Sequence, residues 1–377
     1  MNQRKDSKYF LYVDGLKAVA CLMIVCYHYL ALYRDAVVFN PSIPWVDRFA
    51  FSPVFGFLTD SGQGFWNYLF FIASGFLISG KKTRTVLNLV KNCLMRFFRF
   101  ALPLLFSCAV IWLISTVFGF HNSETSSLFE NPWFQTAYRN PITILDIIRA
   151  PVDVLLFGRS QINSPYWVIS GMFYASLLIY FLQFLTRSLS DTWRLVIFLA
   201  AAVCLFFCKK VISACLFGAV TRQLSDLLSV NRKTSGITLF FSILSIFLYM
   251  WVIYRRPNFA VFFFICFFVA FFLFVDKTQP AKKLFSSRFL VWLSSLSWEI
   301  YSFHWPILCS VGSLFLLSLS PHLGLPVAYG LSCLTCVFLT LLISILYHHS
   351  LAKLSSDLNA KINAMLSNTF SKHTPGA

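Results

Sequence analysis

Lys17 and His28 lie eleven positions apart in the first long apolar stretch of the chain, LYVDGLKAVACLMIVCYHYL. At about 100° and 1.5 Å per residue, this spacing places both side chains on one helix face, about 16 Å apart. Asp14 falls on nearly the same face. A histidine there can act as a general base near neutral pH, and a lysine can bind an anion or polarise a carbonyl. Because ionisable residues within a membrane helix are costly, the stripe predicts a functional site.

The same three residues also have a purely structural interpretation. Asp14 and Lys17 would neutralise each other near the membrane surface, and His28 would hydrogen-bond at the far interface. Spacing alone leaves both interpretations open.

Two arginines form a second group, in KNCLMRFFRFALP. Arg96 and Arg99 are three residues apart, so they project from one side of a helix, where both could bind one phosphate. Ordinary anchoring of the helix at the cytoplasmic membrane surface is the alternative.

The segment SLSWEIYSFHWPI forms a third group. His304 is expected at a depth similar to that of His28, either as a satisfied core histidine or as part of the site. Glu299, buried in the same helix, needs a basic partner. In FFIASGFLIS, the small residues predict close helix packing, and Ser74 has a second interpretation as a residue lining the site.

Composition shows which elements must position these residues. The chain has 377 residues, of which 58% are hydrophobic and 12% charged, and this predicts an all-α, polytopic membrane protein. About ten transmembrane helices are expected from ten apolar stretches: 10–32, 63–80, 101–120, 166–185, 193–208, 211–229, 236–254, 258–275, 289–318 and 327–348. The net charge of +17 is spread over loops, which favours the membrane surface and phosphate-bearing substrates over nucleic acid.

The distribution of charge gives an orientation. With both termini in the cytoplasm, most of the 31 lysines and arginines lie on the cytoplasmic side. We expect a membrane domain over residues 1–350 and a partly disordered cytoplasmic tail over 351–377. The longest connection, 121–165, then faces the exterior, as an acceptor site, a lid or a plain connector. Its segment ILDIIRAPVDVLLF is amphipathic and is expected along the membrane surface.

Other chemistries find little support in the sequence. The eleven cysteines lie mostly in apolar runs, so we expect no disulfides, and the CxxC of Cys333 and Cys336 is interpreted as packing. No phosphate-binding loop, HExxH or GxSxG motif is present, and no metal is expected.

Taken together, these segments resemble acyltransferase family 3, integral-membrane O-acyltransferases that modify bacterial surface glycans. VDGLKAVACLMIVCYHY is similar to the family's opening motif, FFIASGFLIS to its FFxxSGF pattern, and MRFFRFALP to its RxxRxxxP pattern. LSSLSWEIYSFHWPI is similar to a late family signature. The chain resembles the stand-alone form, which lacks the extracytoplasmic hydrolase-like domain of many relatives.

The resemblance implies transfer of an acyl group, first of all acetyl from cytoplasmic acetyl-CoA, to a hydroxyl of a surface glycan such as lipopolysaccharide O-antigen. It implies a location in the bacterial inner membrane. Arg96 and Arg99 would bind the CoA phosphates and Lys17 would orient the donor. His28 would act as general base or carry the acyl group transiently. The sequence departs from the family at Met172, where a glutamate is common.

A transporter or flippase for a glycan-lipid or an amphipathic small molecule would also account for ionisable residues within membrane helices. A binding or assembly subunit without turnover is a third interpretation. Acceptor identity and the length of the acyl group do not follow from the sequence.

Overall fold

The computed structural model describes residues 10–39, 65–80, 83–125, 128, 132–228, 232–252 and 257–371. Within these ranges all regular secondary structure is helical, which confirms the all-α prediction. The first half contains α2 (Leu11–Phe39), α5 (Phe65–Ser79), α6 (Val86–Phe118), α7 (Asn122–Thr125), α8 (Pro132–Thr136), α9 (Ile144–Phe157), the 3₁₀ turn η2 (Ser164–Tyr166) and α10 (Trp167–Leu185). The second half contains α11 (Asp191–Phe206), α12 (Lys210–Leu227), α13 (Arg232–Val252), α14 (Pro257–Lys277), α15 (Gln279–Phe285), α16 (Arg288–Ser295), α17 (Ser297–Ile307), the π-helical turn η3 (Leu308–Gly312), α18 (Ser313–Leu323), α19 (Leu325–Tyr347), the π-helical turn η4 (His348–Ala352) and α20 (Lys353–Ser371).

The described parts of all ten apolar stretches fall mainly on helices, but fewer segments qualify as membrane spans. Six segments of the described chain are long and apolar enough: Leu11–Tyr29, Val86–Phe118, Ser164–Leu185, Phe259–Lys277, Ser297–Leu323 and Leu325–Thr369. Trp66–Ser79 and Lys233–Tyr249 are apolar but shorter. The expected count of about ten spans is therefore not confirmed. α11 is short, and α12 carries Lys210, Arg222 and Asp226, which lowers its hydropathy.

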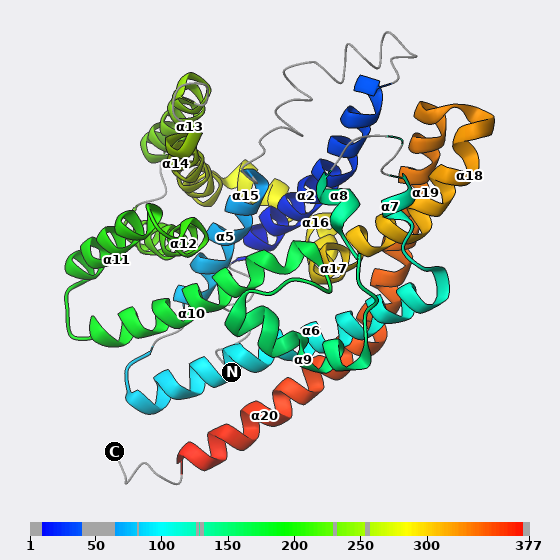
Figure 1. Ribbon diagram of the computed structural model, residues 1–377. Coiled ribbons are helices and arrows are strands. Elements are labelled where there is room, and N and C mark those ends of the chain that lie inside the picture. Colours follow the sequence, from blue (N-terminus) through cyan, green and yellow to red (C-terminus); the bar gives the residue numbers. More distant parts are fainter. Residues whose placement is uncertain are drawn as a thin grey trace.

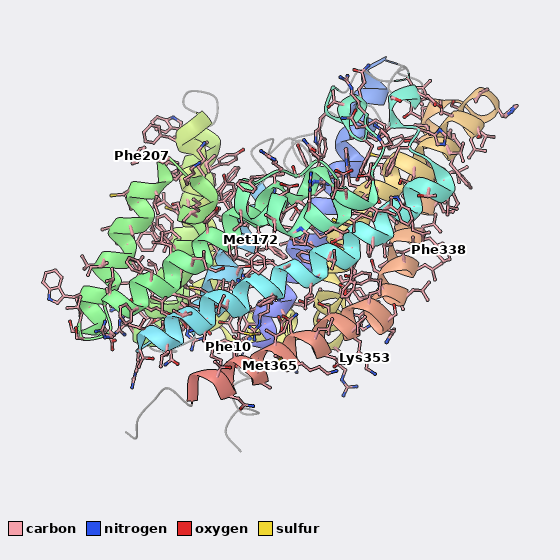
Figure 2. The ribbon with its side chains drawn as sticks, turned by 60° about the horizontal axis from the view of Figure 1, so that its bottom comes forward. Phe10, Met172, Phe207, Phe338, Lys353 and Met365 are labelled. Atoms are coloured by element: carbon pink, nitrogen blue, oxygen red, sulfur yellow. The ribbon has the colours of Figure 1, made fainter. Side chains whose placement is uncertain are left out.

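The arrangement in Figure 1 is a central bundle with two flanking parts. α13 and α14 form a pair that stands beside the bundle, and α20 runs along the same side as α6. The exposed aromatic side chain of Phe338, on α19, projects from the edge of the bundle in Figure 2, as expected for a helix face that contacts lipid. Of the expected tail 351–377, residues Lys353–Ser371 form helix α20.

The predicted amphipathic segment in the long connection is helix α9. Its first turn is a capping box, in which the Thr143 hydroxyl accepts from the Asp146 N–H while the Asp146 carboxylate accepts from the Thr143 N–H. The Thr143 hydroxyl also donates to Oδ2 of Asp146 at 2.6 Å, and this bond, together with that from the Thr143 N–H, holds the pKa of Asp146 below its usual range. Ile147 and Val154 are buried, and α9 packs against α6 (Figure 1).

Close backbone contact joins α5 to α12. A Cβ atom on Gly75 would lie 1.8 Å from the carbonyl oxygen of Cys215, and one on Gly218 would lie 2.1 Å from that of Ile72. Only glycine fits at either position, and this is the close helix packing that the SGF sequence predicted.

α2 and α17 run parallel and in register. The Cys21 thiol contacts the Ser297 carbonyl oxygen at 3.4 Å, and His28 contacts His304, and each pair is separated by 276 positions. This agrees with the sequence-based topology, in which the first and ninth apolar stretches cross the membrane in the same direction. The register places the His28 end of the polar stripe of α2 against SWEIYSFHWPI.

Candidate functional site

A pair of histidines forms the centre of the candidate site. Nδ1 of His28 lies 2.6 Å from Nε2 of His304, with 11° between the ring planes. His28 is 9% exposed and His304 is fully buried. The structure thus joins two residues that the sequence analysis treated separately, one from each of two parallel helices.

The second nitrogen of His304 determines the direction of this hydrogen bond. Nδ1 of His304 lies 3.0 Å from the carbonyl oxygen of Ile300, and a carbonyl only accepts, so Nδ1 carries the proton. In the neutral ring Nε2 of His304 is then the acceptor, and Nδ1 of His28 donates to it. Nε2 of neutral His28 therefore carries the basic lone pair.

His28 also lines a cleft of about 1150 Å³, which we call the histidine cleft. Its lining comes from α2, α5, α8, α9, α10 and α12 and from the loops between helices, and is Tyr27, His28, Asn67, Tyr68, Trp133, Leu156, Phe157, Gly158, Trp167, Ser170, Gly171, Tyr174, Leu178, Phe207, Cys208, Lys209, Lys210, Val211 and Ile212. The lining is thus mostly aromatic and aliphatic, with a few polar groups, which is typical of a small-molecule site.

Trp133 is the residue of this cleft that sequence reasoning missed. Its ring centroid lies 5.1 Å from that of His28 and 3.9 Å from that of Trp305, on which it stacks. Its indole N–H donates to the Ser164 hydroxyl at 2.7 Å. A tryptophan in a long polar connection was the available signal. The connection 121–165 is therefore more than a plain connector, because it places an aromatic ring against His28.

Pro306 explains how this connection is held on α17. A proline has no N–H, so the carbonyl four residues earlier, that of Ser302, lacks its helical donor. The Asn163 side chain supplies one, donating to the Ser302 carbonyl oxygen at 2.8 Å. The backbone N–H of His121 likewise donates to the Cys309 carbonyl oxygen in η3, at 2.9 Å.

Lys17 lies apart from the histidines. Its ammonium group is 3.0 Å from the carboxylate of Asp14, and the two side chains are 21% and 38% exposed. This is the ion pair of the structural interpretation. The structure therefore joins Asp14 with Lys17, and His28 with His304, but shows no contact between the two pairs.

Glu299 has the basic partner that was expected for it. Nδ1 of His348, in η4, lies 3.1 Å from Oε1 of Glu299, while Oε2 is buried without a hydrogen bond among the described residues. His348 belongs to the segment YHHSLAKL after the last apolar stretch, and sequence spacing gave no indication of this pairing.

Arg96 and Arg99 differ in their surroundings. Arg96 is half-buried, its guanidinium lies 4.3 Å from the centroid of Phe100, and its Nε donates to the Ser176 hydroxyl at 2.9 Å. Ser176 in turn donates to the Met172 carbonyl oxygen at 2.6 Å. Met172 itself is buried, near the centre of the view in Figure 2. At this point of α10 the Arg96 guanidinium is therefore bound by the hydroxyl of Ser176, one helical turn after Met172. Arg99 is exposed.

The remaining candidate, Ser74, is half-buried on α5 beside Gly75. It does not line the histidine cleft or any other large cavity of the described chain. All eleven cysteines are free thiols. Among the described residues, no three histidine, cysteine or acidic side chains gather as a metal site requires.

Comparison with protein families found one that covers most of the chain. A family described as an acyltransferase domain matches residues 10–346. The matched range contains the histidine pair, Arg96 and the long connection. No curated protein and no solved structure matches the chain.

Proposed function

The chain belongs to acyltransferase family 3, and from this premise we propose that it transfers an acyl group, acetyl first of all, from acyl-CoA to a hydroxyl of a cell-surface glycan. That the protein is a membrane acyltransferase follows from the family and from the apolar helices. The observation that supports the proposed transfer to a hydroxyl is the hydrogen-bonded chain from the Ile300 carbonyl through His304 to His28, at the wall of the cleft.

In the proposed reaction His28 acts as general base. Nε2 of His28 takes the proton of the acceptor hydroxyl while its oxygen attacks the carbonyl carbon of the thioester. The carbon–sulfur bond then breaks, the thiolate takes up the proton from His28, and the products are an ester and free CoA. His304 keeps Nδ1 of His28 protonated and holds the ring in place, as the orienting residue of a catalytic triad does.

The surroundings of His28 favour a sugar as acceptor. Trp133, Trp167 and Tyr174 present aromatic rings to the cleft, and Asn67 adds a polar group. The C–H groups on one face of a pyranose pack well on the electron-rich face of an aromatic ring, while its hydroxyls bind amide groups.

The donor would approach from the opposite end of α2. With the amino terminus in the cytoplasm of a bacterial inner membrane, Lys17 lies nearer the cytoplasm than His28. Lys17 would then orient the donor, and Arg96 and Arg99 would contact CoA phosphates, Arg99 from an exposed position and Arg96 from a half-buried one.

This function can be tested by supplying labelled acetyl-CoA and candidate glycans to membranes that contain the protein. Wild-type membranes should label the glycan, and His28→Ala should reduce the rate about 10²- to 10⁴-fold at unchanged protein abundance. His322→Ala, at an exposed histidine on α18, is the matched control and should keep the wild-type rate. Transport of a glycan without acylation would favour a transporter and contradict the proposal.

A further inference from the structure

A second cavity lies away from the histidine cleft, where five helices begin or end. It has a volume of about 540 Å³, and we call it the arginine cavity. Its charged lining is Arg84, Arg187, Arg194, Arg222, Asp191 and Asp226. Arg84 precedes α6, Arg187 follows α10, and Arg194 and Arg222 lie on α11 and α12. Neither the sequence motifs nor the proposed reaction uses these residues.

The positive charge of this cavity is only partly neutralised. Arg194 and Arg222 pair with Asp191 and Asp226 at 3.0 and 3.3 Å. Both carboxylates are largely exposed, at 78% and 63%, so these pairs are weak and a stronger anion can replace them. Arg84 and Arg187 have no acidic partner among the described residues. The lining therefore has an excess of positive charge and several planar donors for phosphate oxygens.

Aromatic rings outside the lining stack on two of the arginines, and a polar acceptor lies within the lining. The guanidinium of Arg222 lies 4.3 Å from the ring centroid of Phe10, and that of Arg187 lies 4.2 Å from the ring centroid of Phe184. Such stacking holds each guanidinium in place. Arg187 donates one N–H to the Phe184 carbonyl oxygen at 2.9 Å, and its other N–H groups can donate to oxygen atoms of a ligand. Oε1 of Gln223 is buried at the cavity and accepts no hydrogen bond from the described residues, so it can accept one from an amino or hydroxyl group of a ligand.

The arginine cavity and the histidine cleft share their helices. On α5, Asn67 lines the cleft and Ser79 the cavity; on α12, Lys210 lines the cleft and Arg222 the cavity. Twelve helical residues separate the members of each pair, about 18 Å. α2 and the residue before it repeat the pattern, with Phe10 stacked on Arg222 and His28 at the cleft.

We infer that the arginine cavity binds the phosphate-bearing nucleotide of acyl-CoA, an inference that rests on the proposed function. Acyl-CoA carries its phosphates at one end and its thioester on a long flexible arm at the other. Two sites at opposite ends of the same helices match that division. The 3′-phosphate branches from the ribose, away from the diphosphate that leads to the arm, so the cavity binds the 3′-phosphate while Arg96 and Arg99 contact the diphosphate.

Equilibrium binding to the purified full chain in phosphatidylcholine nanodiscs tests the inference without turnover. The wild type should bind CoA about tenfold more tightly than 3′-dephospho-CoA, and adenosine 3′,5′-bisphosphate should compete with CoA. Arg84→Gln combined with Arg187→Gln should remove most of this discrimination while binding of 3′-dephospho-CoA changes less. Arg288→Gln, an exposed arginine of α16 outside the cavity, is the matched control and should bind as the wild type does.

The outcomes separate this inference from the proposed function. If CoA binds equally well to the wild type and to the double variant, the assignment of the nucleotide to the arginine cavity is wrong. The proposal that acyl-CoA is the donor is then unaffected. A wild type that binds no CoA would overturn both. If phosphatidylglycerol binds the wild type but not the double variant, while CoA binding is the same in both, the cavity holds a lipid headgroup and the inference is wrong. Competition by adenosine 3′,5′-bisphosphate in the wild type gives a result even where a variant fails to fold.

Discussion

The two ends of the apolar span Leu11–Tyr29 of α2 carry ionisable residues on one face, but the surroundings of these residues differ. His28 is almost completely buried, and its ring bonds to His304 on another helix. Lys17 is partly exposed and pairs with Asp14 on its own helix. Residues on one helix face therefore do not necessarily form one site, because the neighbouring helices determine which of them has a partner on another helix.

The energies of the two pairs differ for the same reason. A partly exposed pair three residues apart on one helix contributes only a few tenths of a kcal/mol, up to about 1 kcal/mol. A buried imidazole that loses its hydrogen-bond partner incurs a desolvation penalty of about 1–3 kcal/mol. We therefore expect function to depend strongly on the histidine pair and weakly on the lysine pair.

After His28 itself, the largest effect in this comparison is expected at His304. His304→Ala removes the acceptor that orients His28, and we expect transfer to fall about 10- to 100-fold, as for other orienting partners. His304→Gln should recover part of the rate, because its side-chain oxygen can reach the position of Nε2 and accept from His28. Initial rates with labelled acetyl-CoA measure both variants.

Asn serves as the matched control for this substitution. The side chain of His304→Asn is too short to place its oxygen at the Nε2 position, so it should remain near the rate of His304→Ala. Equal rates for the Gln and Asn variants would show that His304 serves packing alone, and the orienting role would be wrong.

Arg96 and Arg99 repeat the contrast on a second helix. Arg96 bonds across the bundle to Ser176, while Arg99 is exposed. The double variant Arg96→Ala with Arg99→Ala should raise the apparent KM for acetyl-CoA about tenfold, with most of the rise due to Arg96. Ser176→Ala is the control for indirect effects, since it frees Arg96 without removing its charge. An unchanged KM in the double variant would contradict phosphate binding by these arginines.

The sequence predicted the elements of the fold better than their pairing. The described part of each apolar stretch lies mainly on a helix, because hydrophobicity over a long segment is a local property. The count of spans was less secure, since Arg222 and Asp226 lie within a stretch that looked apolar. Their role at the arginine cavity depends on α6, α10 and α11, which no local pattern reveals.

Partners across the bundle were the hardest part of the site to predict. His28 was a candidate from its spacing, but His304 lies 276 positions away, and Glu299 meets His348 only because a π-helical turn follows α19. Trp133 reaches His28 through a connection whose position depends on the Ser302 carbonyl that Pro306 leaves free. Such contacts depend on helix register and on irregular turns, which single-sequence patterns do not contain.

The smallest effect is expected at Lys17, and it tests the contrast most directly. If Lys17 orients the donor, Lys17→Met should raise the apparent KM for acetyl-CoA roughly two- to fivefold while kcat stays near that of the wild type. Asp14→Asn frees the ammonium group from its partner, so it should leave KM unchanged or lower it. Steady-state kinetics of the two variants in membranes, at matched protein abundance, separate donor orientation from structural pairing. If Lys17→Met instead lost kcat as fully as His28→Ala, both ends of α2 would act in the chemical step, and the distinction between them would be wrong.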